Sequence, residues 1–178
     1  MNYLMAIVIV LCIVVLAAFS VVYFTLRLGI SPMPTALRVR GVVRDALPKH
    51  FDGSIYELGA GWGSLLPILA KAYPQHPIIA YERSWVPFMW TWLRIRCFGP
   101  VTAEIHCADF FESDLAGAGL VVCYLFPSAM DRLAAHLRRT LPPETWVISH
   151  TFALPGWQPI ETRRATDIYR TPVYLYRT

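Results

Sequence analysis

The chain has 178 residues, a hydrophobic content of 56%, a mean hydropathy of +0.44 and a formal net charge of +4 at neutral pH. This length has room for one folded domain plus an additional segment. The lysines and arginines form no dense stripe, so we expect no nucleic-acid partner.

The excess of apolar residues lies at the N-terminus. Residues 4–26 are almost wholly apolar, and no residue from 1 to 26 is charged. As a helix this stretch reaches roughly 30 Å or more, enough to cross a bilayer core. A cleaved signal peptide is the alternative, but it needs a positive leading region and a shorter apolar core. We therefore predict a retained, single-pass transmembrane anchor over residues 1–28.

The charges that flank this segment predict its orientation. No positive residue precedes it, and by the positive-inside rule the rest of the chain faces the cytoplasm, beside anionic lipid. The cysteines that follow it have no metal-ligand spacing and are typical of a reducing compartment, so we expect no metal site. The positive residues that follow are Arg27, Arg38, Arg40, Arg44 and Lys49, and the cysteines are Cys97, Cys107 and Cys123.

Residues 29–34 contain two prolines and a glycine and are predicted to be a linker. The domain is then expected to occupy residues 35–178 and to begin with an amphipathic helix over 35–47. Beyond it, strand patterns alternate with helical ones. We predict strands over 54–58, 77–81, 102–107, 120–126 and 146–152, helices over 64–73, 85–97 and from 128, and a short hairpin of strands at 160–164 and 173–176.

This alternation predicts an α/β fold. The sheet is expected to be Rossmann-like and mostly parallel, with helices on both faces and a C-terminal antiparallel hairpin. The third helix has an approximate capping box, in which Ser128 is followed by Asp131. The second carries Trp85, Trp90 and Trp92. These tryptophans are expected to pack on the sheet, and the alternative is that one face lies at a lipid interface.

Three alternating glycines follow the first predicted strand. Gly59, Gly61 and Gly63 come directly after Glu57 and Leu58. Glycine permits positive φ and removes the side chain that would block a ligand. The spacing differs from the dinucleotide pattern G-x-G-x-x-G, and a carboxylate there would repel a pyrophosphate. It suits S-adenosylmethionine, which carries an ammonium and a sulfonium and no phosphate. The alternative is a turn that only packs helix on strand.

Acidic residues end the next two predicted strands. Glu82 follows the second strand, where it can accept hydrogen bonds from both ribose hydroxyls, and Asp109 follows the third, where it can accept one from an exocyclic amine. Phe110, beside Asp109, can stack on a purine. Because the carboxyl ends of parallel strands form one edge of the sheet, these residues predict a single cofactor site.

With these motifs the chain resembles the class I S-adenosylmethionine-dependent methyltransferases over roughly residues 54–152. Within them it is similar to the membrane-anchored group that includes the ATP synthase c-subunit lysine N-methyltransferases. That group commonly has an acid in the glycine turn, where this chain has Trp62, and its closing hairpin is longer. The segments that carry the resemblance are the N-terminal span, Pro32–Thr35, Tyr56–Gly59, Tyr124–Pro127 with Met130, and Pro155–Trp157.

The resemblance implies methyl transfer to a lysine of a membrane-associated protein. Tyr124, near the end of the fourth strand, is then an active-site wall or hydrogen-bond partner, unless it is a core aromatic. His150, at the end of the fifth strand, accepts a proton or orients the substrate, unless it only hydrogen-bonds the neighbouring loop. Thr35 covers the cofactor from the N-terminal side, unless it caps a helix.

Two other functions stay open at this point. The acceptor could be a lipid or a quinone-like small molecule. The chain could also be an assembly module that keeps the fold and binds the cofactor without transferring a methyl group. A lysine acceptor must first lose a proton, since its free pKa is about 10.4.

Overall fold

The structure, a computed structural model, describes residues 2–28, 33–99 and 102–178, so residues 29–32 of the predicted linker over 29–34 lie outside the described residues. The α-helices are α1 (Asn2–Leu28), α2 (Leu37–Asp45), α3 (Leu66–Ala72), α4 (Trp85–Phe98) and α5 (Pro127–Thr140), and a 3-10 helix, η1, spans Phe110–Glu112. The strands are β1 (Ser54–Leu58), β2 (Ile78–Tyr81), β3 (Ala103–His106), β4 (Ala118–Cys123), β5 (Trp146–His150), β6 (Glu161–Arg164) and β7 (Pro172–Arg177).

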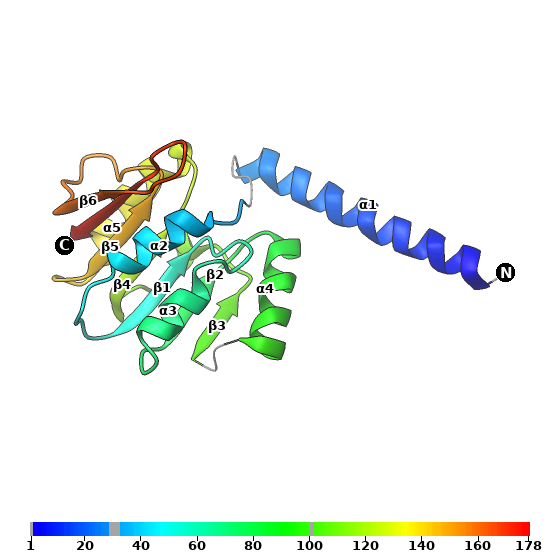
Figure 1. Cartoon of the computed structure of the whole chain (residues 1–178), viewed down its shortest axis with the longest axis horizontal. Coiled ribbons are helices and arrows are strands. Elements are labelled where there is room, and N and C mark those ends of the chain that lie inside the picture. Colours follow the sequence, from blue (N-terminus) through cyan, green and yellow to red (C-terminus); the bar gives the residue numbers. More distant parts are fainter. Residues whose placement is uncertain (1, 29–32, 100–101) are drawn as a thin grey trace.

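The strands form one sheet in the order β3-β2-β1-β4-β5-β7-β6 (Figure 1). The first five are parallel, whereas β7 runs antiparallel to both β5 and β6. This arrangement confirms the predicted mostly parallel sheet with its antiparallel hairpin. The chain reverses its direction of progress along the sheet between β1 and β4, which is where ligands bind in open α/β sheets.

Alternating residues of the central strands build a core on each face. Ile55 of β1 and Leu120 of β4 point toward α2 and α3, in one buried cluster. Leu58, three residues after Ile55, and Val121, one residue after Leu120, pack with residues of α5 in the other buried cluster. Burial on both sides explains why these strands read as nearly continuous apolar runs. Helices on both faces are thus confirmed.

The fourth strand and the helix after it begin and end differently from the prediction. β4 stops at Cys123 instead of residue 126, so Tyr124 lies just beyond the strand. Pro127 is the first residue of α5, where its fixed φ is compatible with a helix. The N-cap is therefore Phe126, which makes no side-chain capping bond, and the capping box expected at Ser128 is wrong.

Other predicted boundaries were too long by one to three residues. β3 ends at His106, and Asp109 follows it as the N-cap of η1 instead of closing the strand. β5 ends at His150, so this residue does lie at the end of a strand as predicted, but the strand does not continue to Phe152. Helix α2 begins at Leu37 after Ala36, which excludes Thr35 as its cap.

The tryptophans of α4 do not pack on the sheet, so the expected packing is wrong. Trp85, Trp90 and Trp92 are 58%, 55% and 40% exposed. Pro87 and Thr91 are the buried residues of this helix, which lies along β3.

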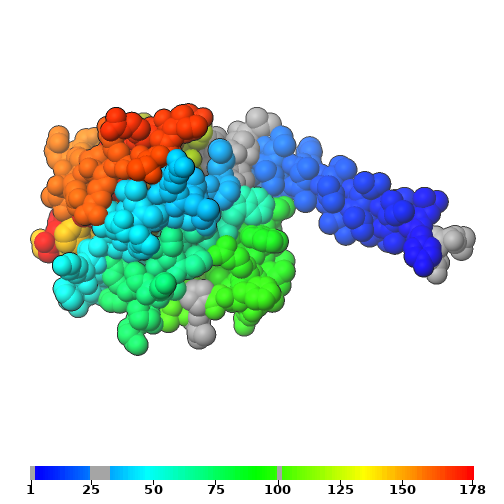
Figure 2. Space-filling view, viewed as in Figure 1, coloured from blue at the N-terminus to red at the C-terminus, as the bar shows by residue number. Residues whose placement is uncertain are grey.

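Helix α1 projects from the domain as a single long rod (Figures 1 and 2). Within the described residues it is the one helix long and apolar enough to cross a membrane, judged by length and composition. Its described side chains from residue 3 to 24 are exposed or half-exposed, so they add nothing to the two buried clusters.

Candidate active site

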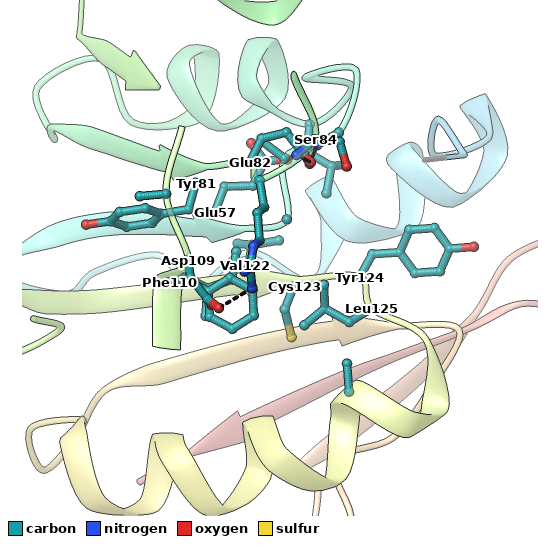
Figure 3. A pocket seen from close by; sticks show the side chains of 18 of the residues that line it. Glu57, Tyr81, Glu82, Ser84, Asp109, Phe110, Val122, Cys123, Tyr124 and Leu125 are labelled. Carbon is teal, nitrogen blue, oxygen red and sulfur yellow. Dashed lines mark hydrogen bonds and ion pairs between the residues drawn. The ribbon is translucent and has the colours of Figure 1, made fainter. Parts of the chain in front are cut away.

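A pocket opens at the carboxyl ends of β1, β2 and β4, where the strand order reverses (Figure 3). Gly63 and His150, both predicted site residues, do not line it. The predicted residues that do are Thr35, Glu57, Gly59, Gly61, Glu82, Asp109, Phe110 and Tyr124.

The glycine turn forms the floor of the pocket. Gly59 and Gly61 have φ values of 78° and 54°, which favour glycine. The N–H groups of Gly59 and Ala60 both donate to the carbonyl of Tyr81, which fixes the turn against β2. A Cβ on Gly59 would lie 2.7 Å from Cδ2 of Leu125, whereas one on Gly61 would meet nothing within 4 Å. Gly61 therefore borders open space where a ligand can approach the backbone.

Gly63 has a packing role. A Cβ there would lie 2.7 Å from Cγ2 of Thr91, on α4. The Thr91 hydroxyl also donates to the carbonyl of Gly61 at 2.9 Å. Because Gly63 has no side chain, α4 can pack closely against the glycine turn. For this one glycine, the alternative that it serves packing and not ligand binding therefore holds.

Glu82 braces the turn from the end of β2. Its Oε2 accepts from the N–H of Gly61 at 2.8 Å, and its Oε1 accepts from the N–H of Ser84 at 2.6 Å. These bonds hold the buried carboxylate in one orientation. Each oxygen keeps a further lone pair, so the group can still accept from two ribose hydroxyls.

Glu57 is the unusual group of the site. It is 4% exposed, and its Oε2 has no hydrogen-bond partner among the described residues. Burial raises the pKa of this carboxyl to about 8, and the charge of Arg94 opposes the rise. A buried acceptor without a donor is costly, which fits a ligand that brings a donor. The residues present therefore fit the ammonium of S-adenosylmethionine.

Asp109 does not lie free at the end of its strand. Its Oδ1 accepts from the N–H of Phe111 at 3.1 Å, and its Oδ2 pairs with Nη1 of Arg83 at 2.6 Å, the ion pair dashed in Figure 3. The guanidinium of Arg132, on α5, lies 4.0 Å from the centre of the Phe111 ring.

Sequence reasoning did not find two cations at this edge of the pocket, Arg83 and Arg132. Arg83 could have been found, because it directly follows Glu82. Arg132 gave no signal, since a basic residue on an amphipathic helix is typical of a solvated face.

Tyr124, His150 and Thr35 form one cluster at the other side. The rings of Tyr124 and His150 stack with centroids 4.2 Å apart. Nε2 of His150 lies 3.2 Å from the Thr35 hydroxyl, and the N–H of Thr35 donates to the Ser64 hydroxyl. Burial lowers the pKa of His150 to about 4, so the imidazole is neutral at pH 7. The cluster ties the N-terminal segment to the glycine turn and to β5.

With this geometry described, sequence comparison identifies the family. A model of the ANTKMT methyltransferase domain matches residues 57–161. The chain belongs to this methyltransferase family. It is 30% identical over 127 residues to a protein-lysine N-methyltransferase of Saccharolobus islandicus (strain REY15A), a match that covers 70% of this chain and 79% of the relative. It is also 26% identical over 156 residues to the mouse adenine nucleotide translocase lysine N-methyltransferase, covering 82% of this chain and 67% of the relative.

Solved structures agree with this assignment. An RNA methyltransferase from Salinibacter ruber, in complex with S-adenosyl-L-homocysteine, is 25% identical and superposes with a TM-score of 0.66, over 82% of this methyltransferase and 93% of that chain. A precorrin-6y C5,15-methyltransferase from Geobacter metallireducens, 17% identical with a TM-score of 0.60, covers 79% of this chain and 88% of its own and shows the shared fold. The protein is an enzyme that uses S-adenosylmethionine as its methyl donor.

Proposed function

We propose that this methyltransferase transfers the methyl group to the ε-amine of a lysine on a membrane-associated protein. The observation that carries the proposal is the match to two relatives named as lysine N-methyltransferases, one of which acts on adenine nucleotide translocase. The absence of a dense basic stripe in the sequence argues against a nucleic-acid acceptor.

We assign the cofactor to the pocket above the glycine turn. When bound, S-adenosylmethionine supplies an electrophilic methyl group on a sulfonium. Glu57 would bind the ammonium, and Glu82 would accept from the ribose hydroxyls. Phe110 and Asp109, at the far edge of the pocket, would hold the adenine by stacking and by a hydrogen bond.

Tyr124 and His150 are assigned to the acceptor side. Lysine becomes a nucleophile only after it loses its proton, and a pocket that excludes water favours the neutral amine. His150 has too low a pKa to take that proton efficiently. We therefore assign it the orienting role, in which it fixes the ring of Tyr124 and the hydroxyl of Thr35, while Tyr124 forms the wall beside the amine.

We further propose that α1 is a single-pass anchor over residues 1–28 and that the enzyme domain, residues 35–178, faces the cytoplasm. Support comes from the length and composition of the apolar helix and from the positive residues that follow it. Tethering would raise the concentration of the enzyme near membrane substrates without any new contact.

The test uses the full chain, membranes and S-adenosylmethionine labelled in its methyl group. Hydrolysis of the membrane proteins should release labelled methyllysine, and a matched Glu82→Ala enzyme should release little. Label found only in the lipid extract would contradict the lysine proposal and favour a lipid or quinone-like acceptor. Cofactor binding without transfer to any membrane fraction would favour the assembly module.

A further inference from the structure

Helix α4 presents its largest apolar side chains to the outside. A helix that covers a sheet normally points its apolar stripe inward and polar residues outward. Here the buried positions are Pro87 and Thr91. The α4 outer face, as we define it, consists of four exposed residues at helical spacing on one side of the helix: Trp85, Met89, Trp92 and Leu93. A patch of this kind on a folded domain marks an interaction surface.

The chemistry of this surface matches a membrane interface. Tryptophan is enriched where the hydrocarbon meets the headgroups, because its ring is apolar and its N–H is polar. Helix α4 contains no acidic residue, and it carries the exposed Arg96 in its last turn. The guanidinium of Arg96 lies 5.6 Å from the centre of the Trp92 ring. Aromatic groups with adjacent cations favour an anionic lipid surface.

The position of α4 points to the same partner. Figure 1 shows α4 at the edge of the domain from which α1 projects, with its axis running across that of α1. The two helices are in contact, and Figure 2 shows α4 in green on the side toward the projecting α1. If α1 crosses a bilayer, a helix placed across its end lies along the membrane surface.

We propose that the α4 outer face binds the interface of an anionic bilayer. The proposal rests on the proposed anchoring by α1 and adds a second, independent contact with the membrane. Ser84, which lines the pocket, immediately precedes α4, and Thr91 bonds the glycine turn. Docking therefore holds the rim of the active site next to the headgroups. The substrates of the enzyme would therefore be lysines that lie close to the membrane surface.

The test places a fluorescent probe on the full chain in nanodiscs of phosphatidylcholine and phosphatidylglycerol. Cys12, Cys97 and Cys107 are first replaced by serine, and the buried Cys123 stays. A nitrobenzoxadiazole label is then attached after Met89→Cys, or after Gln75→Cys as the control. Gln75 is exposed in the turn between α3 and β2.

We expect lipids with a nitroxide near the headgroup to quench the label at position 89 several-fold more than the label at position 75. Iodide in the water should quench the label at position 75 more than the label at position 89. Replacing Trp85 and Trp92 by serine should abolish the difference while cofactor binding persists, because these two side chains lie outside the buried clusters. Removing the anionic lipid should weaken the lipid quenching at position 89.

A third protein, labelled at the native Cys12 near the middle of α1 and tested with lipids that carry the nitroxide deep in the acyl chain, separates the two proposals. Lipid quenching at Cys12 but not at position 89 would keep the anchor and overturn the docking. Lipid quenching at neither position would overturn both the anchor and the docking. Protection of position 89 from iodide in detergent, together with a dimeric mass, would mean that a second copy of the chain covers the face, and this too would overturn the proposal.

Discussion

The proposed binding of the cofactor ammonium by Glu57 predicts that cofactor binding depends on pH. The pKa of its carboxyl is about 8 in the ligand-free enzyme, so the group is mostly protonated at pH 7. An ammonium ligand favours the charged form, and binding must therefore release a proton. We expect the affinity for S-adenosylmethionine to rise by up to about tenfold per pH unit between pH 6 and 8. Calorimetric titrations in buffers of different ionisation enthalpy would measure both the affinity and the released proton.

The Glu57→Gln variant is the control for this prediction. It should bind more weakly, show little pH dependence and release no proton. The dependence of stability on pH should also differ between the two proteins. In the ligand-free wild type, the raised pKa of Glu57 means that the unfolded chain loses its proton more readily than the folded one, so stability falls as pH rises from about 4.5 to 8. The amide variant cannot titrate there and should not show this loss. An unchanged pH profile in the variant would mean that another group controls binding.

His150 acts on stability in the opposite direction. Its pKa is lowered to about 4 by burial, so the folded enzyme resists protonation that the unfolded chain accepts below pH 6.5. Stability from this residue is present above pH 6.5 and is lost as pH falls toward 4, by about 2 kcal/mol at pH 5. Urea unfolding at pH 7 and pH 5 should show this loss in the wild type and a smaller one in His150→Asn. Equal losses in both proteins would contradict the assignment.

Some of the site residues were predictable and others were not. The glycine turn and Glu82 could be predicted because strand ends and spacing determine where the backbone places them. The pairing of Asp109 with Arg83 could not, because it depends on the direction of two side chains in the loops that follow β2 and β3. The packing role of Gly63 likewise depends on Thr91, which is distant in the sequence.

At the scale of elements, α2 has a residue that weakens it. Gly41 lies within this helix, and a Cβ there would meet nothing within 4 Å. Glycine costs about 0.5–1 kcal/mol relative to alanine inside a helix. Gly41→Ala should therefore increase the free energy of unfolding by about this amount, as measured by urea denaturation. A decrease would show that the chain bends at this position in solution.

The periodicity of the sequence predicted which segments form helices and which form strands, but it did not predict the residues at which they begin and end. The pattern of residues 120–126 stays apolar after β4 stops, because Leu125 is buried as part of the turn over Gly59 and not as part of a strand. Pro127 then determines where α5 begins. Tertiary contacts thus decided boundaries that the local pattern left open.

For the whole molecule, α1 should be separable from the chemistry. Its described side chains lie outside the buried clusters, so removing residues 1–32 should leave the affinity for S-adenosylmethionine within about twofold. Methylation of membrane proteins should fall at least about tenfold, because the tether no longer concentrates the enzyme. Parallel binding and transfer assays would measure both. An equal loss of binding and transfer would mean that α1 supports the fold.

The mostly parallel sheet and its C-terminal antiparallel hairpin followed from the pattern of strands and helices in the sequence. The outward tryptophans of α4 did not, because their pattern fits a core and a membrane face equally well. Only the exposure of these side chains in the folded domain excludes the core.

The most direct measurement is a calorimetric titration of S-adenosylmethionine into the full chain and into two alanine variants. In Gly61→Ala the new Cβ would enter open space in the pocket, whereas in Gly117→Ala it would only approach the Tyr56 hydroxyl at 3.6 Å. The φ of +54° at Gly61 adds strain of about 1–2 kcal/mol, so circular dichroism must show that the variant is folded. We predict that Gly61→Ala raises the Kd at least about tenfold and that Gly117→Ala leaves it unchanged. Wild-type affinity in a folded Gly61→Ala protein would contradict binding of the cofactor above the glycine turn.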